Sequence, residues 1–327
     1  MSRILEVQDL KTHFFTSLGT VRAVDGVSFT VERGEVLGLV GESGSGKSAT
    51  GFSILNLIDP PGRIAGGRIL YRGRDLANCS ERDWQKIRGR HIAMIFQDPM
   101  MTLNPVLKIS TQMIEAVQAH ESISRAAARE RCRQALARVG IPSPDERLEA
   151  YPHQFSGGMR QRVAIAIALL HDPDLIIADE PTTALDVTIQ AQILFEVQKL
   201  ADQSGTAMIW ITHDLSVVSS LADTLAVMYA GKIVEQGPAP QVVSRPMHPY
   251  TSGLIDSIPS RNRRGADLRQ IPGMAPSILD LPEGCAFRPR CFRASEACLA
   301  VPPMRELRSG QSARCFHPLD PGAGAGA

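Results

Sequence analysis

Two kinds of hydrophobic pattern alternate along the first part of the chain. Residues 21–31 alternate apolar and polar positions and are rich in β-branched side chains, which predicts a strand of an antiparallel layer. Short, continuously apolar runs at residues 35–40, 175–178 and 207–212 predict buried strands. Helical patterns separate these runs, notably at residues 188–202. Buried strands that alternate with helices predict an α/β fold with a mostly parallel sheet.

The middle of the chain, about residues 101–170, is predicted to be a small helical subdomain inserted into the first domain. Ser124 is the expected N-cap of one of its helices, and Gly140 is expected just beyond the end of that helix. Cys132 falls on the apolar face of the same helix. A buried core thiol is therefore favoured over a metal ligand at this position.

After about residue 240, periodic segments become rare while Pro, Arg and Cys become frequent. Residues 241–320 are predicted to be a C-terminal extension with little core of its own, and residues 321–327 (PGAGAGA) a disordered tail. Residues 259–317 hold ten Arg, no Lys and five acidic residues, a local excess of five positive charges.

The whole chain of 327 residues has 35 basic and 34 acidic side chains, so its net charge of +1 does not draw it to nucleic acid. No apolar run approaches the ~20 residues that a membrane-spanning helix needs. The N-terminus lacks the apolar stretch of a secretory signal, so a cytosolic protein is expected. Six Cys in such a chain favour free thiols or metal ligands over disulfides.

Residues 41–48 (GESGSGKS) match the phosphate-binding pattern G-x-x-x-x-G-K-[ST], between a predicted strand and a predicted helix. The glycines let backbone amides turn toward phosphate oxygens, and the start of the helix adds partial positive charge. Lys47 can reach the β- and γ-phosphates, and Ser48 can ligate Mg²⁺. A flexible Gly/Ser loop is the alternative, and the strand-to-helix context argues against it.

Two further segments are candidates for nucleotide contact. The strand at residues 175–180 ends in Asp179, expected to hold Mg²⁺, and Glu180, expected to orient and deprotonate the attacking water. Ser156, Gly157 and Gly158 stand at a helix start and predict a second anion site, with an ordinary N-cap as the alternative. One chain rarely needs two phosphate sites, so the second is expected to serve a nucleotide bound by another chain.

The order of these segments, with Gln97 in IFQDP, residues 184–186 (ALD) and His213, resembles the ATP-binding cassette of ABC transporters. The resemblance runs from about residue 5 to 237. It implies a P-loop NTPase fold over residues 1–240, with a RecA-like parallel-sheet core, an antiparallel β layer and the helical subdomain. It also implies a head-to-tail dimer in which each ATP lies between one P-loop and the other chain's Ser-Gly-Gly signature.

The family's roles fall on matching residues. Gln97 is implied to contact Mg²⁺ and the attacking water, and His213 is implied to contact the γ-phosphate. Phe14 aligns best with the aromatic residue that stacks on adenine, and Phe15 is the second candidate. Met159 stands where the commonest signature has Gln, which removes a side-chain contact only. Catalysis is assigned to Glu180, His213, Gln97 and Lys47. The resemblance implies an ATP and Mg²⁺ site that comprises Phe14, Gly41, Ser43, Gly44, Ser45, Gly46, Lys47, Ser48, Ala49, Gln97, Asp179, Glu180 and His213. The partner's ATP is expected to meet Ser156, Gly157, Gly158, Met159 and Asp186.

Residues 156–162 (SGGMRQR), 178–188 (ADEPTTALDVT) and 248–251 (HPYT) most resemble the D-type ATPase of dipeptide and oligopeptide importers, a group with nickel, glutathione and opine relatives. The resemblance implies a second, F-type ATPase, two membrane permease subunits and an extracytoplasmic substrate-binding protein as partners, and no nucleic acid. It places the chain at the cytoplasmic face of the bacterial inner membrane, where ATP hydrolysis powers uptake of peptides or a related solute.

Two alternatives are weighed against this interpretation. A soluble ABC ATPase acting on nucleic acid or ribosomes is disfavoured by the single cassette and the near-zero net charge. A scaffolding subunit with a dead site is disfavoured because Glu180 and His213 are both present.

Four cysteines lie within 31 residues of the extension: Cys285, Cys291, Cys298 and Cys315. Their spacing is looser than that of a zinc ribbon, so the residues alone leave zinc, an iron–sulfur cluster and free thiols open. A metal centre would staple a segment that has little core. Peptide-importer ATPases with a similar tail carry a [4Fe–4S] cluster, so the resemblance favours a cluster over Zn²⁺. Nearby arginines would offset its negative charge: Arg288, Arg290, Arg293 and Arg314. Cys79 is expected to be a lone thiol.

Overall fold

The computed structural model describes residues 2–77, 79–182, 190–191, 194–195, 198–199, 205–258 and 269–319. The chain divides into two compact units. The helical unit comprises Met1–Ile4, Glu32–Glu35 and Asn78–Ile209; the P-loop unit comprises Leu5–Val31, Val36–Ala77 and Trp210–Ala327. In the described part, no helix is both long and apolar enough to cross a membrane.

The P-loop unit contains an antiparallel layer of four strands in the order β2-β1-β4-β5. These strands are β1 (Arg3–Thr16), β2 (Gly19–Glu32), β4 (Gly62–Tyr71) and β5 (Arg74–Asp75). β1 and β4 pair from Leu5 opposite Tyr71 to Phe14 opposite Gly62. The alternating pattern at residues 21–31 therefore forms β2, as predicted.

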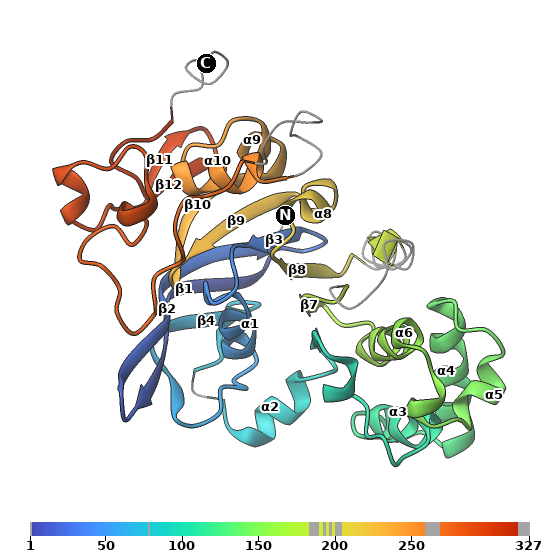
Figure 1. The fold of residues 1–327 in the computed structure, drawn as a ribbon. Coiled ribbons are helices and arrows are strands. Elements are labelled where there is room, and N and C mark those ends of the chain that lie inside the picture. The colour runs from blue at the N-terminus through green and yellow to red at the C-terminus, as the bar shows by residue number, and fades with distance from the viewer. Residues whose placement is uncertain are drawn as a thin grey trace. The chain divides into compact units, whose positions relative to one another are not determined.

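A second run of strands in this unit carries the phosphate loop. Its order is β11-β12-β10-β9-β3, with β3 and β9 parallel and the other neighbours antiparallel (Figure 1). Their bounds are β3 (Val36–Val40), β9 (Thr224–Tyr229), β10 (Lys232–Pro238), β11 (Arg305–Arg308) and β12 (Gln311–Ala313). All five residues of β3 are buried. Because β12 pairs with β10, the C-terminal extension adds its strands to the same sheet as the P-loop strand.

Helices and 3₁₀ turns complete the P-loop unit. They are α1 (Lys47–Ile54), α8 (Leu215–Leu221), α9 (Ala239–Ser244), α10 (Pro249–Asp256), η4 (Arg288–Arg290) and η5 (Glu296–Leu299). α8 packs closely on β3, since a Cβ at Gly38 would lie 2.4 Å from Val218 Cγ2. Glycine is therefore required in the middle of this buried strand.

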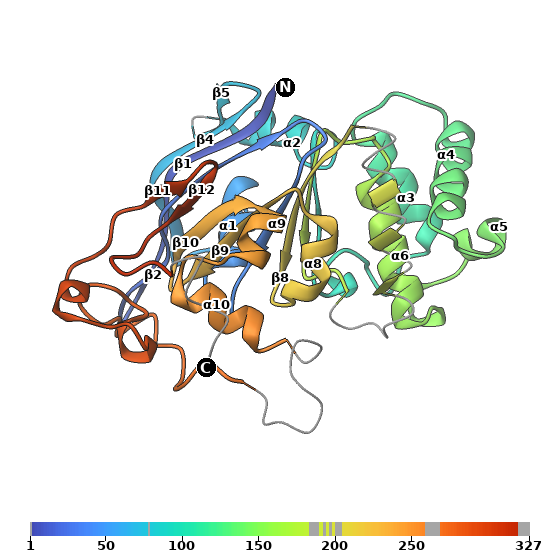
Figure 2. The same ribbon diagram turned by 90° about the horizontal axis from the view of Figure 1, so that it is seen from above.

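The helical unit holds two parallel strands and a group of helices. β6 (Ile92–Ile95) pairs with β7 (Leu175–Asp179), so that Ile92 lies opposite Leu175. The helices α3, α4, α5 and α6 gather on one side of the unit (Figure 2). The helix bounds are α2 (Glu81–Ile87), η1 (Pro99–Met101), α3 (Ile109–Gln118), α4 (Arg125–Arg138), α5 (Pro144–Leu148), η2 (Pro152–Gln154) and α6 (Gly157–Ala168). The chain passes into the P-loop unit within β8 (Ala207–Thr212).

Local predictions in the helical unit are confirmed. Ser124 caps α4 by accepting a hydrogen bond from the Ala127 N–H at 3.2 Å, and Gly140 follows the helix with a φ of +71°. Cys132 is fully buried on α4, as a core thiol should be. The helix expected at residues 188–202, the Asp186 segment and the tail at 321–327 lie outside the described residues, apart from a few positions of the first.

Candidate nucleotide-binding site

The P-loop connects β3 to α1 and is closed on itself by hydrogen bonds. The Lys47 ammonium donates to the carbonyl oxygens of Gly41 at 2.8 Å and Glu42 at 3.0 Å. The Ser45 N–H also donates to the Glu42 carbonyl, at 3.2 Å. The Glu42 carbonyl therefore holds both the turn of the loop and the side chain that is expected to meet the phosphates.

The glycines of the loop stand where other residues do not fit. A Cβ at Gly41 would lie 2.2 Å from the Met228 carbonyl oxygen, and Gly44 and Gly46 have φ angles of +78° and +103°. The Ser45 hydroxyl is buried and has no hydrogen-bond partner among the residues that the structure describes. A phosphate oxygen in the loop would supply the missing partner, so the loop fits an anionic ligand at the start of α1.

A second group of polar residues lies at the carboxyl ends of β6 and β7 in the helical unit. These strands are parallel, so Gln97 and Glu180 follow the same edge. The Gln97 amide donates to the Glu180 carboxylate at 3.4 Å, a long hydrogen bond. Asp179 ends β7 and is only 3% exposed, while Glu180 has a φ of +45°, in the left-handed region. The structure thus brings Gln97 and Glu180 together, as a shared site requires.

The predicted signature segment forms the start of α6. Ser156 is the N-cap and accepts a hydrogen bond from the Met159 N–H at 3.3 Å, and α6 begins at Gly157. A Cβ at Gly157 would meet no atom within 4 Å, so the backbone there is open. This geometry satisfies the N-cap interpretation, and Gly157 at the helix start is exposed.

The predicted site residues are divided between the two units. Gln97, Asp179, Glu180 and the signature belong to the helical unit, whereas the P-loop and His213 belong to the P-loop unit. His213 is exposed at the end of β8. Asp186 lies outside the described residues.

The two candidate aromatic residues for adenine have different surroundings. Phe14 is half-buried beside Gly62, where an added Cβ would lie 2.5 Å from Phe14 Cε1. Phe15 is 41% exposed, and the Arg63 guanidinium lies 4.4 Å from the centre of its ring. Phe15 is therefore the more accessible ring, and adenine stacking on Phe14 stays a prediction.

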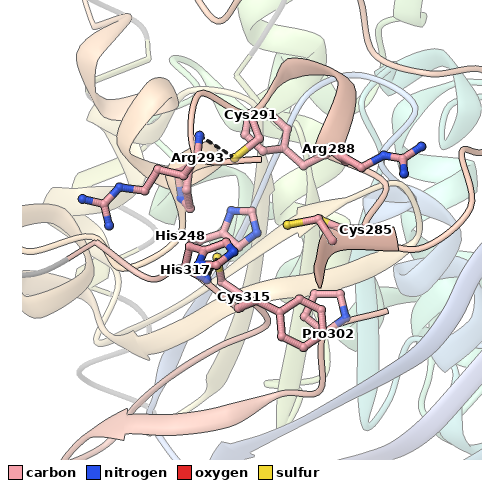
Figure 3. A pocket seen from close by; sticks show the side chains of 12 residues that line it. His248, Cys285, Arg288, Cys291, Arg293, Pro302, Cys315 and His317 are labelled. Carbon is pink, nitrogen blue, oxygen red and sulfur yellow. Dashed lines mark hydrogen bonds between the residues drawn. The ribbon is translucent and has the colours of Figure 1, made fainter. Parts of the chain in front are cut away.

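The four C-terminal cysteines line one cavity, with His248, Phe287, Arg288, Arg293 and His317 among its other walls (Figure 3). Cys291 Sγ accepts from the Arg293 N–H at 3.4 Å, and Cys315 Sγ accepts from the His317 N–H at 3.3 Å. Burial raises the pKa of Cys285 and Cys291, and raises that of Cys315 to about 11. All four are free cysteines. The local sequence cluster is thus a spatial cluster.

A site for a single metal ion is not formed there. Within the described ranges, no three His, Cys, Asp or Glu side chains are placed to hold one ion. A structural zinc ion needs four donors at about 2.0–2.3 Å. The prediction of a bound metal is therefore not supported by the arrangement of donors, although four thiols share the cavity.

Arg290 was predicted to offset charge at the cysteines, and this prediction is wrong. Its guanidinium instead donates to both carboxylate oxygens of Glu42, at 2.7 and 3.0 Å. Arg314 likewise donates to the Ile233 carbonyl at 3.2 Å rather than lining the cavity. The role of Glu42 was missed, because it occupies an unspecified position of the P-loop pattern and its partner is 248 residues away.

A buried strand, a glycine-rich loop closed around a lysine and a following helix define a P-loop nucleotide-binding protein. Comparison with known proteins narrows the class. Residues 24–183 match the family described as "ABC transporter", and residues 234–298 match "Oligopeptide/dipeptide transporter, C-terminal region".

Individual relatives cover almost the whole chain. Identity is 47% over 317 residues to the oligopeptide transport ATP-binding protein OppD of Salmonella typhimurium, covering 97% of this chain and 94% of that one. The identity to the dipeptide transport ATP-binding protein DppD of Bacillus subtilis is 49% over 310 residues, covering 94% of this chain and 92% of that one. The chain therefore belongs to the ATP-hydrolysing subunits of ABC transporters, in the group with an oligopeptide/dipeptide transporter C-terminal region. The resemblance found from the motifs is confirmed.

Solved structures support the fold. cbiO1 from Clostridium perfringens, part of the ABC transporter complex cbiONQ, superposes with a TM-score of 0.63 at 28% identity, covering 75% of this chain and 92% of that one. The ATP-binding cassette MJ0796, in a dimer bound to ADP and Pi, gives a TM-score of 0.65 at 24% identity, covering 72% and 98%. The predicted ABC cassette fold is confirmed.

Proposed function

We propose that this chain hydrolyses ATP to power the import of peptides through a membrane transporter. The observation that carries the proposal is the P-loop, closed around Lys47 and preceded by a buried strand, in a chain whose relatives are named for oligopeptide and dipeptide transport. The match of residues 234–298 to the peptide-transporter C-terminal region supports the choice of cargo.

The residues divide the reaction between them. The amides of residues 41–46 and the Lys47 ammonium bind the β- and γ-phosphates. Ser48, Gln97 and Asp179 would hold Mg²⁺, which would supply positive charge against the phosphates. Glu180 accepts a proton from the attacking water, while His213 donates a hydrogen bond to the γ-phosphate. Phe14 or Phe15 stacks on adenine.

The active form is a dimer of two cassettes. Ser156, Gly157, Gly158 and Met159 bind the γ-phosphate of an ATP held by the partner's P-loop, and Asp186 lies at the seam. ATP then closes two cassettes, and its hydrolysis releases them. The partner is an F-type ATPase, and the pair sits on two permease subunits at the cytoplasmic face of the inner membrane. A substrate-binding protein delivers cargo from the other side.

The substitution Glu180→Gln tests the assignment of the base. The amide keeps the shape of the side chain but cannot accept the proton, so we expect the rate of ATP hydrolysis to fall by about 10²- to 10⁴-fold. ATP affinity should be retained, because Glu180 is not a phosphate ligand. Phosphate release and equilibrium ATP binding are measured side by side. The exposed Glu146→Gln on α5 is the matched control and should behave as wild type. Undiminished hydrolysis by the Glu180 variant would refute the assignment.

Cargo is tested with the assembled transporter in lipid vesicles. Uptake of a labelled peptide should require ATP, the permease subunits and the binding protein, and should stop with Glu180→Gln. Co-purification of nucleic acid or ribosomes in place of permease subunits would instead favour a soluble ABC ATPase and contradict the import proposal.

We infer that the cysteine cavity holds a [4Fe–4S] cluster. Four thiols line one cavity. Such a cluster is ligated by four cysteines, one at each of four irons. Arg288 and Arg293, which line the cavity, would offset the negative charge of the cluster. The cluster would act as a structural staple for the extension.

Anaerobically purified protein should then be brown, absorb near ~400 nm and contain equal amounts of iron and sulfide. Cys291→Ser should lose most of the iron, while Cys132→Ser, a thiol buried on α4, should keep it. If the protein contains zinc and no sulfide, the [4Fe–4S] assignment is contradicted, but a structural role for a metal in the extension is retained. Protein without bound metal would contradict both.

A further inference from the structure

Arg290 connects the C-terminal extension to the P-loop. Its two terminal nitrogens donate to the two carboxylate oxygens of Glu42, at 2.7 and 3.0 Å. This is a bidentate, charge-assisted pair, which is both stronger and more directional than a single hydrogen bond. Both residues belong to the P-loop unit.

The arginine is held in place from the other side. Its Nε donates to the Pro272 carbonyl at 2.9 Å, and its guanidinium carbon lies 5.9 Å from the ring of Tyr229 and 6.0 Å from that of Phe287. The side chain is only 6% exposed, against 29% for Glu42. A planar guanidinium fixed in this way presents its fork in one orientation, which a lysine could not do.

Glu42 is held through its backbone as well. Its N–H donates to the hydroxyl of Tyr250 on α10, at 2.9 Å, and its carbonyl accepts from Lys47 and Ser45. Side chain, amide and carbonyl of one residue thus join the extension to the lysine that meets the phosphates. A shift of Glu42 would be passed directly to Lys47.

The charge of Glu42 gives the pair a second effect. A carboxylate on the P-loop repels the phosphates of ATP unless a cation neutralises it. Arg290 supplies that cation at hydrogen-bonding distance. Its removal would leave an unpaired negative charge, partly shielded from water, on the phosphate-binding loop.

We propose that Arg290 is a positioning residue for ATP binding: it holds Glu42, and through the Glu42 carbonyl Lys47, in the arrangement that receives the phosphates. The inference rests on ATP binding at the P-loop. The nucleotide site then depends on a side chain of the cysteine-rich extension. Arg290 itself does not contact the reacting atoms.

The test measures the ATP dissociation constant of the full-length chain, with a fluorescent ATP analogue and Mg²⁺. We expect Arg290→Gln to weaken binding on the order of tenfold, within the usual range of coupling between sites. Arg305→Gln, an exposed arginine on β11 of the same extension, is the matched control and should stay within about twofold of wild type, because it contacts neither the loop nor the cysteine cavity.

The double variant separates positioning from general loss of structure. Glu42→Gln removes the repelling charge, so Arg290→Gln should cost about twofold or less in that background. An unchanged dissociation constant in Arg290→Gln, or a full tenfold loss also in the Glu42→Gln background, would overturn the proposal. Thermal unfolding and iron content of every variant show whether the fold and the cysteine cavity are intact.

A variant that keeps the charge covers the case in which Arg290→Gln does not fold. The ATP dissociation constant of Arg290→Lys should lie between those of wild type and Arg290→Gln. When Arg290→Lys is combined with Glu42→Gln, this loss of affinity should disappear. Wild-type affinity in Arg290→Lys with Glu42 present would contradict a role for the fork. If the unmodified chain fails to bind ATP, the proposed function is refuted. If the unmodified chain binds ATP and Arg290→Gln binds it equally well, only the positioning role of Arg290 is refuted.

Discussion

The two inner glycines of the P-loop form a matched pair for testing the local geometry. Both have positive φ angles, +78° at Gly44 and +103° at Gly46. A Cβ at Gly44 would meet no atom within 4 Å, whereas a Cβ at Gly46 would lie 2.1 Å from the carbonyl oxygen of Ala23 on β2. Alanine at the two positions therefore differs mainly in this one steric overlap.

The magnitudes follow from these geometries. A left-handed backbone costs a residue with a Cβ about 1–2 kcal/mol, which is all that Gly44→Ala should lose in the free energy of unfolding. At Gly46 the overlap must also be relieved by moving β2 or α1, and overpacking of this kind costs typically ~1–3 kcal/mol more. We therefore expect about 2–5 kcal/mol for Gly46→Ala.

Urea unfolding without nucleotide, followed by tryptophan fluorescence and far-UV circular dichroism, measures the difference. Trp210 on β8 is fully buried and reports on the P-loop unit. Hydrogen exchange of α1 and β2 localises the effect, since only Gly46→Ala should loosen both. Equal destabilisation by the two variants, or unchanged exchange in β2, would refute the steric argument.

Two further predictions concern buried groups. Glu235 is fully buried and accepts hydrogen bonds from the Met247 N–H, the His248 N–H and the Gln311 amide, each at 2.8 Å. Glu235→Gln turns an amide donor toward these donors, so the free energy of unfolding in urea should drop by about 1–3 kcal/mol, while the exposed Glu283→Gln should have almost no effect. Burial raises the pKa of Cys132 to about 11, so its thiolate is scarce at pH 8. A thiol reagent followed by mass spectrometry should label Cys132 only after unfolding, and native labelling as fast as at Cys79 would contradict its burial.

The elements that depend on local sequence were predictable. Residues 207–212 form β8 with the expected bounds, and all six positions are buried. Ser124 and Gly140 delimit α4, because capping depends on a few neighbouring residues. The P-loop belongs to the same class, since its pattern specifies glycines at the backbone angles that the loop adopts.

The misassigned arginines show where sequence proximity fails. Arg288 and Arg290 both lie within three positions of Cys291 in the sequence, but η4 is a 3₁₀ turn with three residues per turn. Two residues that are two positions apart on such a turn are rotated by about 240° around the axis, so their side chains point about 120° apart. Arg288 therefore lines the cysteine cavity, while Arg290 points to Glu42. Side-chain direction on a short turn cannot be read without knowing that the turn is 3₁₀.

The aromatic pair at the end of β1 poses a similar difficulty. Phe14 and Phe15 are adjacent on a strand, so they point to opposite faces. A one-residue uncertainty in alignment therefore exchanges a half-buried ring for an exposed one. The pattern establishes that an aromatic residue is present there, and only the pairing of β1 with β4 decides which ring is accessible.

Glu42 links the P-loop to the C-terminal extension. The phosphate-binding pattern leaves this position unspecified, so an acidic side chain there adds a negative charge that the pattern does not compensate. Arg290 neutralises it and Tyr250 fixes its amide, and both come from the chain beyond residue 240. The solved cassettes match only 72–75% of this chain. A cassette whose P-loop lacks an acidic residue at this position would have no need of such an arginine. The acidic loop residue and the basic residue of the extension are thus two halves of one electrostatic arrangement, and a change in either is expected to matter only while the other is present.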